Sequence, residues 1–515
     1  MTTSQGAISV LTSSGTVRGH EAQGICTFLG IPFAAPPVGL LRFQAPEPPE
    51  RWEGTREADV FGPPPPQMPI ADSEMPGSGP TRRHNADEWL TVNVWTPDPG
   101  ARGLPVMVYI YGGGYRAGSS SSPDIDGRKL AQSGVVVVTA NHRVGMEGYA
   151  SLGGAPENRA LLDQIELLRW VQENISKFGG ETHAVTIFGE SAGAGAVANL
   201  LVAPAARGLF TRAIAQSCPC IYLTRELARD IARELVSPLG LLPTAAALRD
   251  VSPDALAEAG LALDARTGPI YGRAGELATR WGPMAGTVTA FSPVVDGDAL
   301  PMDPLSALQA GVAKDVSLLI GHTRDEWRLF LAMTGLAGQI VDEDAEWALD
   351  TFGPQPGGAQ AVRATYPDAT PEDLFTIVQS DWLLRMPSLK LAQAQAGGGG
   401  KAHLYELTYS APASNGALGA CHYLDVPLVF GNLEAAPDMF GERPPEESAE
   451  MSRLLQASWT AFAAEGDPGW AAFSDPERLT GVFASGAGPQ QLPYPEERAR
   501  KLWSAHQFEV LQLHS

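Results

Sequence analysis

Short runs of apolar and β-branched residues recur along the chain, separated by glycine, proline and polar residues. Several are continuously apolar rather than alternating, which is typical of strands buried on both faces of a parallel sheet. The runs that predict strands lie at 7–11, 24–31, 90–95, 104–111, 135–140, 185–188, 213–216, 317–320 and 403–408. A proline-rich stretch at 62–80 predicts a surface loop, and 397–400 a flexible turn.

Helical periodicity alternates with these runs. Residues 157–177 carry Leu161, Leu162, Ile165, Leu168 and Val171 on one stripe, while 191–202 and 449–464 also predict helices. Alternating strands and helices indicate an α/β fold with a large, mostly parallel sheet covered by helices. The segment 222–301 is helical and irregular, so we expect a cap insertion there. Without internal repeats or a clear linker, we expect residues 1–515 to form one domain.

Composition narrows the function. Of 515 residues, 44% are hydrophobic and 18% charged, which excludes a disordered chain, and the formal charge of −22 argues against nucleic acid or anionic membranes as partners. An acidic surface could favour cationic substrates, although solubility is the simpler explanation. Arginine and alanine usage suggests a bacterial source. Without a leader-like or membrane-length apolar segment, we expect a cytoplasmic protein that is a monomer or homodimer.

The four cysteines are expected to be free thiols. Cys218 and Cys220 stand too close together for an ordinary disulfide, and no Cys or His pairs have zinc-ligand spacing. We therefore expect no metal and no cofactor.

Ser191 is the candidate nucleophile. It is the centre of Gly189-Glu190-Ser191-Ala192-Gly193, which fits the pattern Gly-x-Ser-x-Gly. The preceding strand and the following helix of small residues supply the strand–turn–helix context of a nucleophile elbow. A helix start also favours developing negative charge. The alternative is a serine that caps a helix in a tight turn.

A glycine run follows the predicted strand that ends at Tyr111. In this run, Gly113 and Gly114 can present uncovered N–H groups to an oxygen that becomes negative during acyl transfer. The N–H of Ala192 would complete such an oxyanion hole. An ordinary flexible turn is the alternative, whereas a phosphate-binding loop lacks its Lys-Ser/Thr pair.

With these motifs in order, the sequence resembles the type-B carboxylesterases, the family of cholinesterases and of bacterial esterases such as those acting on para-nitrobenzyl esters. The resemblance spans nearly the whole chain, through residues 28–34, 41–43, 90–95, 112–114, 141–145, 161–164 and 188–193. It implies an α/β-hydrolase fold and a serine esterase that hydrolyses small-molecule carboxylic esters without a cofactor.

The resemblance also implies the remaining catalytic residues. Glu326, in Arg324-Asp325-Glu326, corresponds to the family's acid, and His422 to its base. Chemistry alone does not choose Glu326 over Asp325. The implied mechanism is proton transfer from Ser191 to His422, an acyl-enzyme intermediate, and hydrolysis by water.

Other roles are less specific. By the same resemblance, Arg143 pairs with Asp163, and Arg42 with Asp87. Among the remaining histidines, His322 could line the site without acting as the base.

Tyr115 and Trp327 could shape an acyl pocket, or pack elsewhere, and Glu190 could tune charge near Ser191 or form a fixed part of the elbow. The cholinesterase disulfide loops have no counterpart, because Gln67 and Trp89 stand where the first would have cysteines. Choline-ester specificity is therefore not expected. Carbamate or aryl-amide hydrolysis by the same residues remains an alternative, as does a non-catalytic binding module on the same fold.

Overall fold

The computed structural model describes residues 6–67, 87–268, 275–486 and 488–514, and in these residues thirteen strands form one sheet. Twelve strands follow the order β1-β2-β3-β5-β7-β6-β8-β9-β10-β11-β12-β13, with β4 paired to β2. Pairing is parallel from β7 through β12 and antiparallel at both ends, except that β4 pairs with β2 in parallel. The strands are β1 Gly6–Leu11, β2 Thr16–Ala22, β3 Ile25–Pro32, β4 Thr55–Glu57, β5 Thr91–Thr96, β6 Leu104–Ile110, β7 Val136–Ala140, β8 Gly180–Glu190, β9 Arg212–Gln216, β10 Ser317–Thr323, β11 Ala402–Leu407, β12 Leu479–Phe483 and β13 Gln490–Pro493.

The sheet is buried on both faces, as the continuous apolar runs predict. Along β6, Val106 and Val108 belong to one core cluster, whereas Met107 and Tyr109 belong to the other, because successive side chains of a strand point to opposite faces. Helices cover both faces. Their bounds are α1 Arg128–Ala131, α2 Gly145–Tyr149, α3 Arg159–Asn174, α4 Ala192–Val202, α5 Arg225–Val236, α6 Ala245–Leu248, α7 Pro253–Asp264, α9 Glu276–Trp281, α10 Pro304–Gln309, α11 Trp327–Met333, α12 Asp342–Phe352, α13 Gly358–Thr365, α14 Pro371–Ser380, α15 Met386–Gly397, α16 Asp425–Phe430, α17 Pro437–Phe440, α18 Glu446–Glu465 and α19 Glu497–Leu502.

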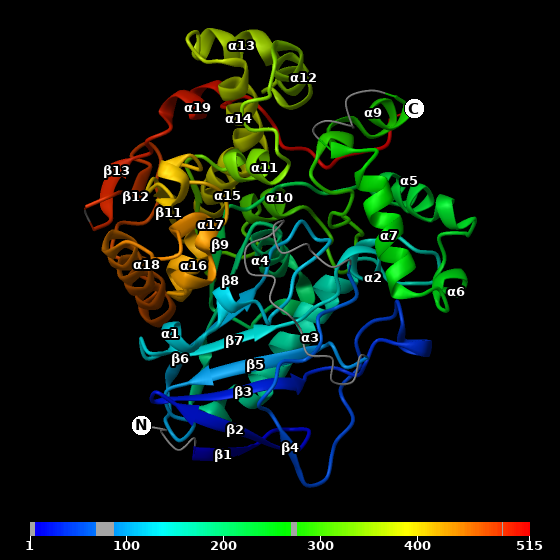
Figure 1. Cartoon of the computed structure of the whole chain (residues 1–515), viewed down its shortest axis with the longest axis vertical. Helices are drawn as coiled ribbons and strands as arrows, with labels where there is room; N and C mark the ends of the chain where they lie inside the picture. The colour runs from blue at the N-terminus through cyan, green and yellow to red at the C-terminus, as the bar shows by residue number, and fades with distance from the viewer. Residues whose placement is uncertain (1–5, 68–86, 269–274, 487, 515) are drawn as a thin grey trace.

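Two groups of helices stand apart from the layers that cover the sheet. Helices α5, α6, α7 and α9 lie together on one side of the molecule, within the segment 222–301, and α11 to α14 lie together at the top of the view (Figure 1). Sequence periodicity predicted the first group and missed the second. It also missed β2, β4, β12 and β13. Of the predicted loop at 62–80, residues 68–80 lie outside the described residues, and 62–67 contain no helix or strand.

The carboxyl ends of the central strands place the candidate site residues at one edge of the sheet. Strand β8 ends at Glu190, directly before Ser191, and β10 ends at Thr323, three residues before Glu326. In open α/β sheets this edge is where ligands bind. Among the described helices, none combines the length and apolar character needed to cross a bilayer. All four cysteines are free, as expected from the sequence.

Candidate active site

Ser191 occupies a strained turn between β8 and α4. Its φ of 56° and ψ of −127° lie outside the regions that non-glycine residues ordinarily adopt, and such strain persists only where the surroundings enforce it. The flanking glycine at 193 is sterically required, because a Cβ there would stand 2.1 Å from the carbonyl oxygen of Ile110. The Ser191 N–H is fixed by donating to the carbonyl of Gln216 at 2.9 Å. The predicted elbow is therefore present in backbone geometry.

The glycine loop lies against this elbow. A Cβ on Gly112 would stand 2.7 Å from the carbonyl oxygen of Glu190 and 3.1 Å from Cβ of Ser191, so only glycine permits this approach. Gly113 and Gly114 follow with φ of 107° and 61°. Among the described residues, no acceptor binds the N–H groups of Gly113, Gly114 or Ala192. These donors are therefore available to a developing oxyanion near Ser191.

Glu326 and His422 are 96 residues apart in sequence and directly bonded in the fold. Nδ1 of His422 lies 2.6 Å from Oε2 of Glu326, and both side chains are buried. The other carboxylate oxygen accepts the Ser217 hydroxyl at 2.6 Å and the Thr323 N–H at 2.9 Å. Burial alone would raise the pKa of Glu326, but His422 and the hydrogen bond from Ser217 lower it. Glu326 is thus held ionised, in position to orient the imidazole.

The second ring nitrogen of His422 points toward the elbow. Nε2 lies 3.0 Å from Oε1 of Glu190, the residue before the nucleophile, but that oxygen receives no aligned hydrogen bond. Among the hydrogen bonds of the described residues, none joins Nε2 to the Ser191 hydroxyl. Catalytic hydrogen bonds are often loose without substrate and tighten in the complex. The ring of Phe330 packs against the imidazole with centroids 5.0 Å apart, which restricts its rotation.

Glu190 and His422 form a coupled, buried pair. Burial raises the pKa of Glu190, and His422 counteracts part of that rise. Burial lowers the pKa of His422, but the carboxylates of Glu190 and Glu326 outweigh it, and the net shift is upward. The protonation of His422 therefore depends on the carboxylates of Glu190 and Glu326, and Glu190 and His422 titrate as a coupled pair.

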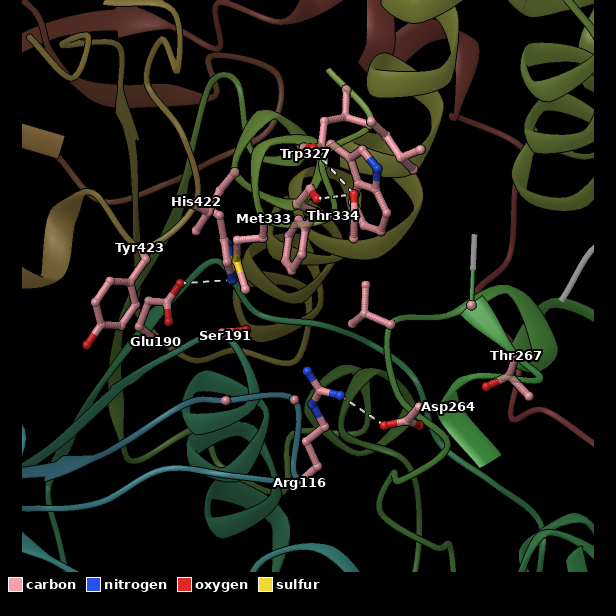
Figure 2. A pocket seen from close by; sticks show the side chains of 18 of the residues that line it. Arg116, Glu190, Ser191, Asp264, Thr267, Trp327, Met333, Thr334, His422 and Tyr423 are labelled. Atoms are coloured by element: carbon pink, nitrogen blue, oxygen red, sulfur yellow. Dashed lines mark hydrogen bonds and ion pairs between the residues drawn. The ribbon is translucent and has the colours of Figure 1, made fainter. Parts of the chain in front are cut away.

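Ser191 and His422 open into a cavity of about 260 Å³, shown in Figure 2. Its described lining includes the proposed oxyanion glycines 113 and 114, Glu190 and Trp327, so these expected residues do come together. The helical segments supply most of the remainder: Asp264, Thr267, Gly268, Val288, Leu329, Phe330, Leu331, Met333, Thr334, Leu336 and Phe375. The wall is chiefly apolar, which suits an organic ester.

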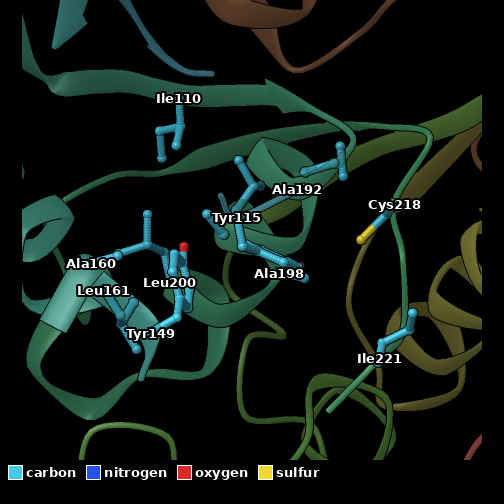
Figure 3. Packing of buried hydrophobic residues seen from close by; sticks show 14 of the residues in the cluster. Ile110, Tyr115, Tyr149, Ala160, Leu161, Ala192, Ala198, Leu200, Cys218 and Ile221 are labelled. Carbon is cyan, nitrogen blue, oxygen red and sulfur yellow. The ribbon is translucent and has the colours of Figure 1, made fainter. Parts of the chain in front are cut away.

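Tyr115 is not among the described residues that line this cavity. With φ of 59°, its backbone directs the side chain into the core, where it packs near Ala192, Ala198 and Cys218 (Figure 3). Its ring lies 4.9 Å from that of Tyr149, and a Cβ on Gly195 would stand 2.1 Å from its hydroxyl oxygen. The geometry thus supports packing, and not pocket formation, for Tyr115.

Of the two ion pairs expected from the sequence, one is present in the structure and the other is not. Arg143 and Asp163 are fully buried and joined by two side-chain hydrogen bonds, of 2.6 and 2.9 Å, as expected. Arg42 does not pair with Asp87, which is exposed. Its guanidinium instead bonds Glu147 at 2.6 Å and the carbonyl groups of residues 248, 249 and 251. Sequence distance gave no indication of this partner, which lies on α2.

His322 is buried and is not among the described residues that line the cavity. Its Nε2 lies 3.0 Å from the Tyr494 hydroxyl, and burial lowers its pKa. Sequence reasoning also missed Ser217, Arg116 and Asp264. Ser217 follows β9 directly, and a polar residue at the carboxyl end of a central strand is the signal that could have identified it. Within the described part of the chain, no cluster of His, Cys, Asp and Glu could hold a metal ion.

Known proteins match this chain over most of its length. The family model described as "Carboxylesterase family" matches residues 6–480. A para-nitrobenzyl esterase of Bacillus subtilis (strain 168) is 34% identical over 506 residues, covering 95% of this chain and 98% of that protein. A phenmedipham hydrolase of Pseudarthrobacter oxydans is 33% identical over a match that covers 89% of this chain and 90% of that protein.

Solved structures show the same similarity. A PNB esterase superposes with a TM-score of 0.83 at 33% identity, covering 96% of this chain and 99% of that one. A carboxylesterase of Geobacillus stearothermophilus gives 0.81 at 32% identity with the same coverage. The mostly parallel sheet and its helices are thus those of the α/β-hydrolase fold.

Proposed function

The chain belongs to the carboxylesterase family and is a carboxylic ester hydrolase, and we propose that it works through Ser191, His422 and Glu326. His422 takes the proton from the Ser191 hydroxyl as that oxygen attacks the ester carbonyl. The N–H groups of Gly113, Gly114 and Ala192 hold the resulting oxyanion. His422 then protonates the departing alcohol, leaving an acyl group on Ser191.

The second half repeats these roles with water. His422 takes a proton from a water molecule, the resulting nucleophile attacks the acyl carbonyl, and the proton returns to Ser191 as the acid leaves. Glu326 keeps the imidazole in the tautomer with its proton on Nδ1 and stabilises the imidazolium. The observation that carries this proposal is the 2.6 Å contact between His422 and Glu326 beside an elbow serine that opens into the same cavity.

We further propose that residues 222–301 act as a cap within a single domain. Support comes from Asp264, Thr267, Gly268 and Val288, which belong to this segment and line the cavity together with Ser191. A cap in this position would select substrates by the shape of its inner wall.

Replacing Ser191 by alanine tests the nucleophile. Turnover of a simple aryl ester should fall by at least about 10³-fold, because the covalent route is lost. Thermal unfolding should be close to that of the parent enzyme. Turnover that survives the substitution would refute the assignment of Ser191 as nucleophile. A separate panel of matched esters, carbamates and anilides would rank the leaving groups that the parent enzyme accepts.

A further inference from the structure

A charged pair stands in the chiefly apolar wall of the cavity. Arg116 comes two residues after Gly114 in the oxyanion loop, and Asp264 is the last residue of α7. Nη1 of Arg116 donates to Oδ2 of Asp264 at 2.9 Å, and both side chains line the cavity. Neither residue has a part in the proposed reaction, so the pair calls for a separate explanation.

The guanidinium uses a fraction of its hydrogen-bonding capacity. Arginine has five N–H donors in a planar fork, and Asp264 takes one of them at Nη1. Among the described residues, no acceptor binds Nε or Nη2 of Arg116. In the view of Figure 2 the guanidinium end of Arg116 lies between Ser191 and Asp264. Because Arg116 and Ser191 line the same cavity, we expect the unused donors to be accessible to a bound substrate.

Arg116 also lies next to one of the proposed oxyanion donors. Its Cγ lies 3.9 Å from the position of a Cβ on Gly114, one of the proposed oxyanion donors. A substrate whose carbonyl oxygen binds at Gly114 would hold groups a few bonds away within reach of the guanidinium. Among the described residues that line the cavity, Arg116 is the only lysine or arginine.

We propose that Arg116 is a specificity residue for esters that carry a carboxylate in addition to the bond that is cleaved. A carboxylate matches the planar fork with two parallel hydrogen bonds, which neutral groups cannot do. The Arg116 side chain keeps 35% of its surface exposed, and the rest of the cavity wall includes apolar side chains such as Val288, Leu329 and Met333. This inference rests on the proposed esterase mechanism and names its preferred substrate class.

Asp264 would then work against binding of such a substrate. Burial raises the pKa of Asp264, and Arg116 lowers it by favouring the carboxylate. An ionised Asp264 shares the guanidinium and repels a second carboxylate. Removing the charge of Asp264 should therefore strengthen anion preference, whereas removing that of Arg116 should abolish it. A pair that merely ties the oxyanion loop to α7 would respond alike to both changes.

The test compares each carboxylate ester with its neutral carboxamide. For the acyl side the probes are mono-4-nitrophenyl adipate and the matching 4-nitrophenyl adipamate. For the alcohol side they are 5-hexanoyloxy-2-nitrobenzoate and its carboxamide. The ratio of kcat/KM for carboxylate over carboxamide is measured for each variant at about 0.15 M salt, where the Debye length of about 8 Å screens the acidic surface. Losses common to both esters cancel in this ratio.

Arg116→Gln should lower the ratio by roughly tenfold in at least one of the two arms, chiefly through KM, because the contact is the same in ground and transition states. Arg116→Lys should retain part of the preference, and Asp264→Asn should raise it. Arg453→Gln is the matched control, since it removes an equal charge from an exposed pair on α18 and should leave the ratio unchanged.

Two results would overturn the proposal: equal ratios in Arg116→Gln and the parent enzyme, or a fall in the ratio in both Arg116→Gln and Asp264→Asn. The arm in which the ratio responds identifies the side of the ester that carries the carboxylate. A parent enzyme that hydrolyses neither these probes nor a simple aryl ester would contradict the esterase mechanism itself, and so is distinguishable from a failure of the specificity proposal.

Discussion

The Ser217 hydroxyl donates a 2.6 Å hydrogen bond to Oε1 of Glu326, on the side of the carboxylate opposite His422. Both residues are buried, and Ser217 adopts a φ of 54° that ordinary residues avoid. Backbone strain of this kind persists only where the surrounding structure enforces it. The fold at the end of β9 therefore fixes Ser217, and through its hydrogen bond the orientation of Glu326. We therefore propose that Ser217 is a positioning residue, which acts through Glu326 and not by touching substrate.

Ser217→Ala should lower kcat for an aryl ester by roughly 10-fold, the equivalent of a buried hydrogen bond to a charged group. Because the lost bond also favours ionised Glu326, the acid limb of the kcat profile should change as well. Ser452→Ala serves as control, because it removes another buried serine hydroxyl, one that donates to the Leu428 carbonyl. Equal rates in the two variants would argue against a positioning role.

The pH profile should depend on Glu190. His422 must be neutral to act as base, and its pKa is raised, so activity should decrease as pH falls through that raised value. Glu190→Gln removes one of the carboxylates responsible, and the midpoint of the acid limb of kcat/KM should move to lower pH. The measurement is a series of rates from pH 5 to pH 10 for both enzymes. An unmoved midpoint would show that Glu190 does not set the protonation of the base.

Gly113 should not tolerate a side chain. A Cβ at this residue would stand 2.3 Å from the carbonyl oxygen of Ala117, so Gly113→Ala must displace the loop that presents the oxyanion donors. We expect a loss in kcat of roughly 10²-fold, as for removal of one such donor. Gly134→Ala is the matched control, because Gly134 also has positive φ but open space around it. Similar kcat values for both variants would contradict the role of the loop.

The Arg143–Asp163 pair should matter for stability and not for chemistry. Both side chains are fully buried, and Asp163→Ala would leave the Arg143 guanidinium without its carboxylate. The free energy of unfolding should fall by about 3–5 kcal/mol, measured by denaturant titration. For comparison, Glu446→Gln breaks an exposed pair with Arg453 and should have little effect. A small change for Asp163→Ala would mean that the site relaxes or admits water.

Much of this fold could be predicted because its central strands are continuously apolar and its elbow and glycine loop are local motifs. Ser191, Gly113 and Gly114 are recognisable from neighbouring residues alone. Glu326 and His422 are distant in sequence, and they were identified by resemblance to a family. Their direct contact becomes visible when β10 and the segment before α16 are placed side by side.

Contacts that depend on backbone direction or on distant partners could not be predicted in this way. Tyr115 follows the glycine loop, yet its positive φ turns it into the core. Arg42 bonds to Glu147, which is 105 residues away in sequence. Nothing in the sequence around Glu147 or Asp87 indicates which carboxylate Arg42 binds. The wall supplied by α11 and α14 was missed because short helices give weak periodic signals.

Covalent labelling tests the central claim most directly. The enzyme is treated with an organophosphate ester, and the adduct is located by mass spectrometry of its peptides, alongside the Ser191→Ala variant. We expect one adduct per chain, on Ser191, formed in step with loss of esterase activity and missing from the variant. An adduct on another residue that accompanies inactivation, or full inactivation with Ser191 unmodified, would contradict it.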